Sequence, residues 1–248
     1  DTVLVTVHPL PTINAGNDTA ICIGSSAQLN ATGGTNYLWT PSAGLSDTTI
    51  SNPIASPTAT TTYFVFATDI NSCANFDSVI VTVNSLPIIS AGFDSTICFG
   101  DTTQLNASGG NAYTWSPIAG LSNPNISNPL AFPSATTSYI VTGTDINLCV
   151  NSDTVVVNVN SLPLVNAGND TSFCIGGSVQ LNASGATSYL WTPSTGLSDT
   201  TISNPIASPG SSTNYMVTGT DGNSCVNTDT VLVTVHPLPT INAGNDTA

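Results

Sequence analysis

The chain has 248 residues, 40% of them hydrophobic, and its 14 acidic residues against no Lys or Arg give a formal net charge of −14. Without cations it cannot neutralise phosphates or form a Lys Schiff base or a P-loop, so nucleic-acid binding and these catalytic chemistries are excluded. Its hydrophobic content is too high for a disordered chain. Because its longest apolar stretches fall far short of the roughly 20 residues of a membrane span, we expect no direct membrane insertion.

The sequence is periodic. Cys22 recurs as Cys98 and Cys174, which sets a period of 76 residues, and residues 1–20 recur letter for letter as 229–248. Equal modules in series are typical of linear arrays. We predict a partial module at each end and three whole repeats between them: 1–9 as the last strand of a preceding module, 10–85, 86–161 and 162–237 as β-sandwich repeats, and 238–248 as the first strand of a following module.

Within the first repeat, turn signals alternate with short strands of period two. The turn signals lie at 15–18, 24–25, 33–34, 41–44, 52–53 and 69–72, and the alternating runs at 27–31, 37–39, 63–67 and 79–83. Thr, Val and Ile dominate, and no stretch has a helical period. This pattern predicts an all-β module of about seven short strands in a two-sheet sandwich.

The apolar positions of this alternation predict the core of each module. Trp39 lies where a third strand is expected, and Tyr63 lies near the start of the penultimate strand, where Ig-like folds place a tyrosine corner. The predicted core, with counterparts 76 and 152 residues later, is Leu29, Trp39, Leu45, Ile54, Tyr63, Val65, Val79, Val81 and Val83.

The six cysteines fall two to a repeat, always 51 residues apart. An even number at equal spacing favours one disulfide per module and an oxidising compartment, namely Cys22–Cys73, Cys98–Cys149 and Cys174–Cys225. We expect each bridge to tie the rim of its own sandwich. A metal site or a redox pair is the alternative, but the chain has no CxxC motif.

Four motifs of the first repeat carry a family resemblance: AGNDTAICIGSSAQLNATGG at 15–34, the run from YLWTPSAGLS to TTTYFV at 37–65, DINSC at 69–73 and DSVIVTV at 77–83. The chain resembles the PKD-like and Ig-like tandem repeats of giant secreted or surface proteins of Bacteroidota, among them gliding adhesins and cargo of the type IX secretion pathway. The resemblance covers the whole chain. It implies tandem β-sandwiches in a linear array, an extracellular or cell-surface location, and a role as spacer, adhesin or filament.

Two carboxylate-rich turns recur in each repeat and raise the question of calcium. Hard cations need several oxygen ligands, whereas an Asx-turn needs only one carboxylate that accepts bonds from nearby backbone N–H groups. No more than two Asp per repeat can be brought together, so we expect no cofactor and keep calcium as the lesser alternative. The positions concerned are Asp18, Asp69, Asp94, Asp145, Asp170 and Asp221.

Ten Asp-Ser/Thr pairs are similar to the O-glycosylation sequon of Bacteroidota, and sugars there would hydrate a surface that has few charges. The same pairs also suit turns and strand starts. The candidate acceptors are Thr2, Thr19, Thr48, Ser78, Ser95, Thr102, Thr154, Thr200, Thr230 and Thr247.

Catalysis is not expected, because the two histidines, His8 and His236, are replaced by Asn84 and Asn160 in the sister repeats and no Glu is present to work with Asp. We therefore predict a structural protein: an extracellular filament or stalk whose partners are copies of itself or further repeats of the same chain. One alternative is a cell-surface adhesin or glycan-binding protein whose binding domain lies outside this sequence, with surface glycans as partners. Another is strand exchange between subunits through residues 1–9. A further alternative is ice or glycan binding by the Thr-rich strands.

Overall fold

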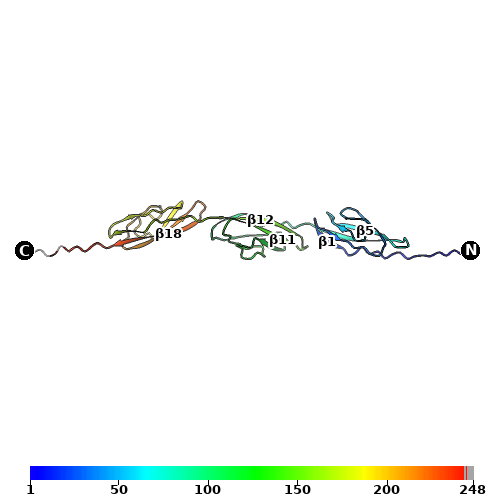
Figure 1. Ribbon diagram of the computed structural model, residues 1–248. Coiled ribbons are helices and arrows are strands. Elements are labelled where there is room, and N and C mark those ends of the chain that lie inside the picture. The colour runs from blue at the N-terminus through cyan, green and yellow to red at the C-terminus, as the bar shows by residue number, and fades with distance from the viewer. Residues whose placement is uncertain (243, 245–248) are drawn as a thin grey trace, which may run out of the picture.

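In the computed structural model, which describes residues 1–242 and 244, the strands fall into three groups of six that follow one another along an elongated molecule (Figure 1). We call these groups modules 1, 2 and 3. The N- and C-terminal ends lie at opposite ends of the row. The described residues contain no helix, and so none that is long and apolar enough to cross a membrane. The predicted fold class, all-β in a linear array, is confirmed.

Each module repeats the same six strands at the same spacing. Module 1 contains β1 (Thr19–Cys22), β2 (Ala27–Gln28), β3 (Asn36–Thr40), β4 (Ile54–Ala55), β5 (Thr61–Thr68) and β6 (Ala74–Asn84). Module 2 contains β7 (Ser95–Cys98), β8 (Thr103–Gln104), β9 (Ala112–Ser116), β10 (Leu130–Ala131), β11 (Thr137–Thr144) and β12 (Val150–Asn160). Module 3 contains β13 (Thr171–Cys174), β14 (Val179–Gln180), β15 (Ser188–Thr192), β16 (Ile206–Ala207), β17 (Thr213–Thr220) and β18 (Val226–His236).

The strands of a module form a four-stranded sheet and a two-stranded sheet. In module 1 the larger sheet has the order β1-β6-β5-β3, and β2 pairs with β4 in the smaller one. β1 runs parallel to β6, with Thr19 beside Val81, whereas the β5–β6 and β3–β5 pairs are antiparallel. The expectation of about seven strands was slightly too high, because the segment before β1 contributes only an isolated bridge between Asn14 and Thr32.

The core of each module lies between its two sheets, on the inward face of the long strands. In module 1 it contains six of the predicted residues, namely Leu29, Trp39, Tyr63, Val65, Val79 and Val81. Leu45 and Val83 are partly buried and pack against them.

Ile54 was wrongly predicted to be a core residue. It is 47% exposed, whereas its neighbour Ala55 is fully buried. Only one of two adjacent strand residues can face the core, and here the smaller side chain does so. The same holds for Leu130 and Ile206.

Two buried aromatic side chains tie the loops of module 1 to its core. The indole Nε1 of Trp39 donates to the carbonyl of Ile50 at 2.9 Å. The hydroxyl of Tyr63 donates to the carbonyl of Ala43, twenty residues upstream, at 2.8 Å. This is the geometry of a tyrosine corner, and it recurs at Tyr139 and Tyr215.

Candidate functional site at the module junctions

The disulfides join neighbouring modules. Cys22 of module 1 bonds Cys149 of module 2, and Cys98 of module 2 bonds Cys225 of module 3, each across 127 residues of sequence. The predicted pairings Cys22–Cys73, Cys98–Cys149 and Cys174–Cys225 are therefore wrong, and Cys73 and Cys174 are free. Four of the six cysteines are bonded, so the expectation of disulfides and an oxidising environment stands, although the partners differ.

The sheet topology explains why a cysteine cannot bond its partner in the same repeat. Cys22 pairs beside Asn84, at the last residue of β6, whereas Cys73 directly precedes the first residue of the same strand. A strand of 11 residues is roughly 33 Å long, and the Cα atoms of a disulfide lie only about 4.4–6.8 Å apart. The two cysteines of a repeat thus lie at opposite ends of one module.

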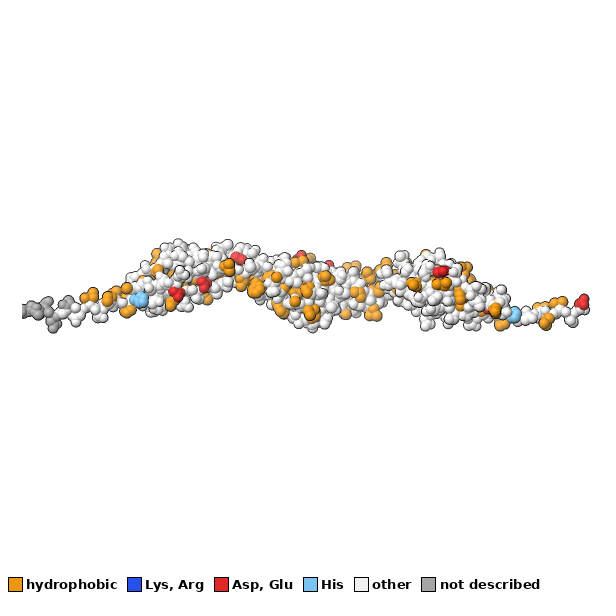
Figure 2. Space-filling view, viewed as in Figure 1, with side chains coloured by type: hydrophobic (Ala, Val, Ile, Leu, Met, Phe, Trp, Pro, Cys, Tyr) orange, Lys and Arg blue, Asp and Glu red, His pale blue; other side chains and the backbone are white. Residues whose placement is uncertain are grey.

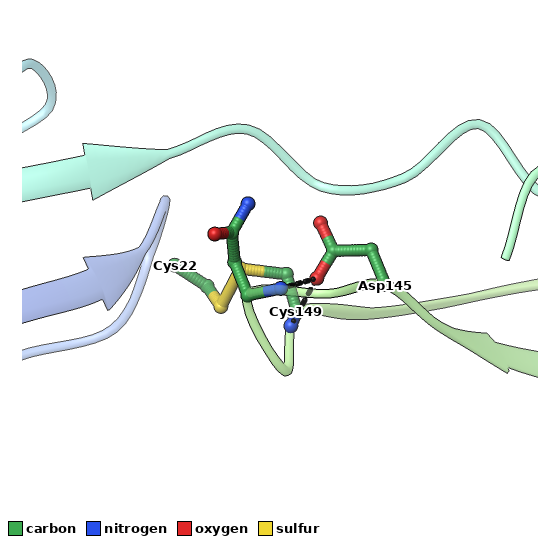
Figure 3. Close-up of a disulfide and its surroundings, with 4 residues drawn as sticks. Cys22, Asp145 and Cys149 are labelled. Atoms are coloured by element: carbon green, nitrogen blue, oxygen red, sulfur yellow. Dashed lines mark hydrogen bonds between the residues drawn. A yellow bond between two sulfur atoms is a disulfide. The ribbon is translucent and has the colours of Figure 1, made fainter. Parts of the chain in front are cut away.

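A tight turn holds Cys149 at the junction (Figure 3). Oδ1 of Asp145 accepts hydrogen bonds from the backbone N–H groups of Asn147 and Cys149, at 2.9 and 2.8 Å. Leu148 takes a left-handed conformation with φ of 64°. This Asx-turn lies at the start of β12, the end of module 2 that faces module 1, and it keeps the fully buried Cys149 in reach of Cys22.

The peptide linker makes a second connection at the same junction. Ser85 and Leu86 are exposed, and the buried Pro87 begins the next module, where its carbonyl accepts a hydrogen bond from Nδ2 of Asn151 at 2.9 Å. Proline restricts one dihedral angle of the linker. Within the described residues no strand of one module pairs with a strand of another. The covalent connections of each junction are one anchored linker and one disulfide.

The six carboxylates considered for calcium each accept hydrogen bonds from the backbone. Oδ1 of Asp18 accepts from the N–H of Ile80 at 2.8 Å, and Asp94 and Asp170 bond the corresponding residues of their modules. Asp69 and Asp221 form the same Asx-turn as Asp145. No group of three or more metal-ligating side chains occurs in the described part of the chain. The Asx-turn interpretation thus accounts for Asp69, Asp145 and Asp221, whereas Asp18, Asp94 and Asp170 each accept from a backbone N–H 62 residues away in the same module.

The candidate acceptors for O-glycosylation differ in accessibility. Five are exposed, namely Thr2, Ser78, Thr102, Thr154 and Thr230. Thr19, Thr48 and Thr200 are half-buried, and the hydroxyl oxygen of Ser95 is buried without a hydrogen-bond partner. Thr247 lies outside the described residues. The folded chain thus offers at least five acceptors to a transferase and withholds Ser95.

Exposed aromatic side chains form a feature that the sequence analysis missed. Figure 2 shows hydrophobic side chains on the outer surface along the whole molecule. Phe66 and Phe76 are 46% and 56% exposed, their rings lie 5.5 Å apart, and Leu38 stands beside Phe66 on the next strand. The corresponding positions are Thr and Ser in module 2. The signal was present, because these phenylalanines do not recur with the period of the core aromatics.

Comparison with known proteins leaves the family open. No family model and no curated protein matches the chain. Among solved structures it is similar to the N-terminal eight Ig domains of Down Syndrome Cell Adhesion Molecule, with a TM-score of 0.46 and 15% identity over 92% of this chain and 37% of that one. It is also similar to the I9–I11 tandem of titin, with a TM-score of 0.38 and 10% identity over 95% of this chain and 100% of that one. At these identities and TM-scores the likeness carries no conclusion about the family or function of the chain.

Proposed function

We propose that the chain is a segment of an extracellular filament or stalk, whose Ig-like modules are locked in line by disulfides across their junctions. The observation that carries this proposal is the pairing of Cys22 with Cys149 and of Cys98 with Cys225. A disulfide within a module would stabilise that module alone. A disulfide between modules also acts on their relative orientation.

The number of connections at a junction limits how two neighbouring modules can move. Two bodies joined by one short linker can bend and twist about it, whereas a second covalent connection beside the linker gives the junction two attachment points and restricts that motion. The repeated geometry of the two junctions extends the same constraint along the row (Figure 1). A rod that keeps its direction over many modules is what a filament or stalk requires.

The remaining parts of the sequence fit this proposal. Residues 1–9 are exposed and outside any strand, and we propose them as the last strand of a preceding module. We propose 10–85, 86–161 and 162–237 as the repeat boundaries, a surface location on a bacterium of the Bacteroidota, and O-glycans on the exposed acceptors. In this arrangement 238–248 belongs to a following module, and part of that segment lies outside the described residues.

Electron microscopy of the native material, with and without a reductant, tests the proposal. We expect straight filaments with an axial repeat of three modules, on the order of 100 Å if each module with its loops measures roughly 30–40 Å. Reduction should leave the modules folded but make the filaments bend. Flexible strings without helical order under oxidising conditions would contradict the proposal.

A second candidate is an adhesive role, and the exposed row of Leu38, Phe66 and Phe76 favours it. Aromatic rings at the surface can stack on sugars or on a partner protein. The matched variant replaces the two rings by the residues of module 2, Phe66→Thr with Phe76→Ser, which the same sheet already tolerates there. If the row is adhesive, this variant loses binding to a panel of immobilised polysaccharides, whereas unchanged binding or its absence in both proteins would exclude a sugar-binding role of the row.

A further inference from the structure

The two free thiols occupy the positions of bonded cysteines. Cys73 of module 1 corresponds to Cys149 and Cys225, which bond the module before their own. Cys174 of module 3 corresponds to Cys22 and Cys98, which bond the module after their own. Each free cysteine thus occupies a position that forms a junction disulfide in the other modules.

The turn at Cys73 has the same local structure as the turns that hold the bonded Cys149 and Cys225. Oδ1 of Asp69 accepts from the N–H groups of Asn71 and Cys73 at 2.8 and 2.9 Å, as Asp145 does at Cys149. Ser72 has the same left-handed conformation, with φ of 63°. Cys73 is half-buried, whereas Cys149 is fully buried next to its partner module. The turn at Cys73 thus has this geometry without a disulfide.

The local structure around Cys174 likewise matches that around the bonded Cys22. Cys174 pairs beside His236 in the parallel register that places Cys22 beside Asn84. The carbonyl of Cys174 accepts the turn hydrogen bond of Gly177 at 2.9 Å, as that of Cys22 accepts the bond of Ser25. The side chain is exposed. This thiol therefore stands at the far end of module 3, and Cys73 stands at the opposite end of the molecule.

We propose that Cys174 of one chain forms a disulfide with Cys73 of a second copy, so that consecutive copies are joined head to tail by a junction like the two within the chain. The repeat supports this: in a second copy placed after module 3, Cys73 takes the position relative to Cys174 that Cys225 takes relative to Cys98. The sequence that leads out of module 3 is also the sequence that leads into module 1. The inference rests on the proposed filament function, because it supplies the covalent step of filament growth.

The reaction is thiol–disulfide exchange with a small disulfide such as oxidised glutathione. One cysteine thiolate attacks the small disulfide and releases one glutathione thiol, and the other cysteine then attacks the mixed disulfide and releases the second. The two protein thiols lose two protons and two electrons in total, and the small disulfide takes up both electrons as it becomes two thiols.

Complementary variants of the whole chain test the pairing. Cys73→Ser keeps only Cys174, and Cys174→Ser keeps only Cys73. Each is incubated alone and mixed with the other in a glutathione buffer, and the products are separated by electrophoresis without reductant. We expect the unaltered chain to give a ladder of multimers. The mixture of the two variants should give a mixed dimer, in a larger amount than the dimer that either variant forms alone. The variant with both substitutions should stay monomeric.

Peptide mapping decides which bond has formed and whether the variants are folded. An Asp-specific protease is suitable, since the chain has no Lys or Arg for trypsin. A Cys73–Cys174 peptide with Cys22–Cys149 and Cys98–Cys225 intact supports the proposal. Dimers of like cysteines, or free Cys73 and Cys174 in chains whose other bridges are intact, would overturn it. If native filaments form while these two thiols stay reduced, the head-to-tail bond is wrong and the filament function survives.

Discussion

Cys22 and Cys149 lie in different modules, yet their Cα atoms are 5.5 Å apart and a disulfide joins them. Because the sheet of each module runs from one junction to the next, the bond passes load from the end of β6 to the start of β12. The row of modules thus has a disulfide in parallel with each of its two peptide linkers. The stiffness of the chain is therefore expected to depend on the redox state of its surroundings.

The first prediction concerns the junction between modules 1 and 2. Replacing both partners, Cys22→Ser with Cys149→Ser, should leave both modules folded and let them bend about the linker. Small-angle X-ray scattering is expected to give a smaller radius of gyration and a broader distance distribution. In the chain-entropy view, loss of a bridge across 127 residues also lowers the free energy of unfolding by about 5 kcal/mol.

The matched control is Cys73→Ser with Cys174→Ser, which removes two cysteines from the same types of turn without breaking a bridge. Its scattering should equal that of the unaltered monomer. An unchanged radius of gyration in the junction variant would show that the linker alone holds the modules in line.

The cysteines also show where sequence reasoning stops. The repeat of 76 residues does not show which cysteines are bonded. A pairing across 51 residues within one repeat and a pairing across 127 residues between two repeats fit the same sequence pattern. Choosing between them requires knowing that β1 runs parallel to β6, a long-range pairing that local turn signals do not encode. The strands themselves followed from alternation because each has one buried face.

The second prediction tests the core assignment at Trp39, whose side chain is 1% exposed. Trp39→Ala removes a large buried side chain and leaves the carbonyl of Ile50 without its donor, so module 1 should lose about 3–5 kcal/mol. The neighbouring Leu38→Ala, on the outward face, should change stability by only about 0.5 kcal/mol. Urea unfolding followed by circular dichroism measures both. Equal losses would contradict the inward position of Trp39.

The wrong prediction of Ile54 as a core residue has a different origin from the wrong prediction of the disulfide pairing. Its strand β4 has only two residues, Ile54 and Ala55. So short a strand does not show by alternation which residue faces the core, and the prediction therefore placed the larger side chain there. The register of β4 against β2, with Ala55 opposite Ala27, decides the matter. In long strands such as β5 and β6, the alternation of apolar and polar residues identifies the buried face, and there the predicted core residues are buried.

The third prediction concerns two glycines with left-handed backbones. At Gly33, with φ of +92°, a Cβ would lie 2.0 Å from the carbonyl oxygen of Thr12, whereas at Gly24, with φ of +84°, it would meet nothing within 4 Å. Gly24→Ala should therefore cost only the backbone strain, about 1–2 kcal/mol. Gly33→Ala should cost about 3 kcal/mol or more, because the segment before β1 must also move away. Calorimetric melting of the two variants side by side measures the difference, and equal melting temperatures would exclude a tight contact at Thr12.

The fourth prediction concerns alkaline pH. Burial raises the pKa of Tyr63, Tyr139 and Tyr215 above the ordinary value of 10.0, so the folded state keeps these protons to a higher pH than the unfolded state does. The corresponding stability is complete below pH 10 and is lost as the pH rises through the folded-state pKa. The free energy of unfolding, measured by urea titration with Trp fluorescence, should fall above pH 10. Each ionised phenol would also lose the proton that it donates to its loop carbonyl.

Replacing these three tyrosines by Phe isolates their contribution. The triple variant should be less stable at pH 7 by roughly 1 kcal/mol for each lost hydrogen bond. Its stability should then fall less steeply above pH 10 than that of the parent, so the two curves converge. Both proteins carry Cys73→Ser and Cys174→Ser, which prevents exchange with the junction disulfides at high pH. Parallel curves would mean that the three corner phenols titrate alike in the folded and unfolded states, and would assign the alkaline loss to repulsion among other charges.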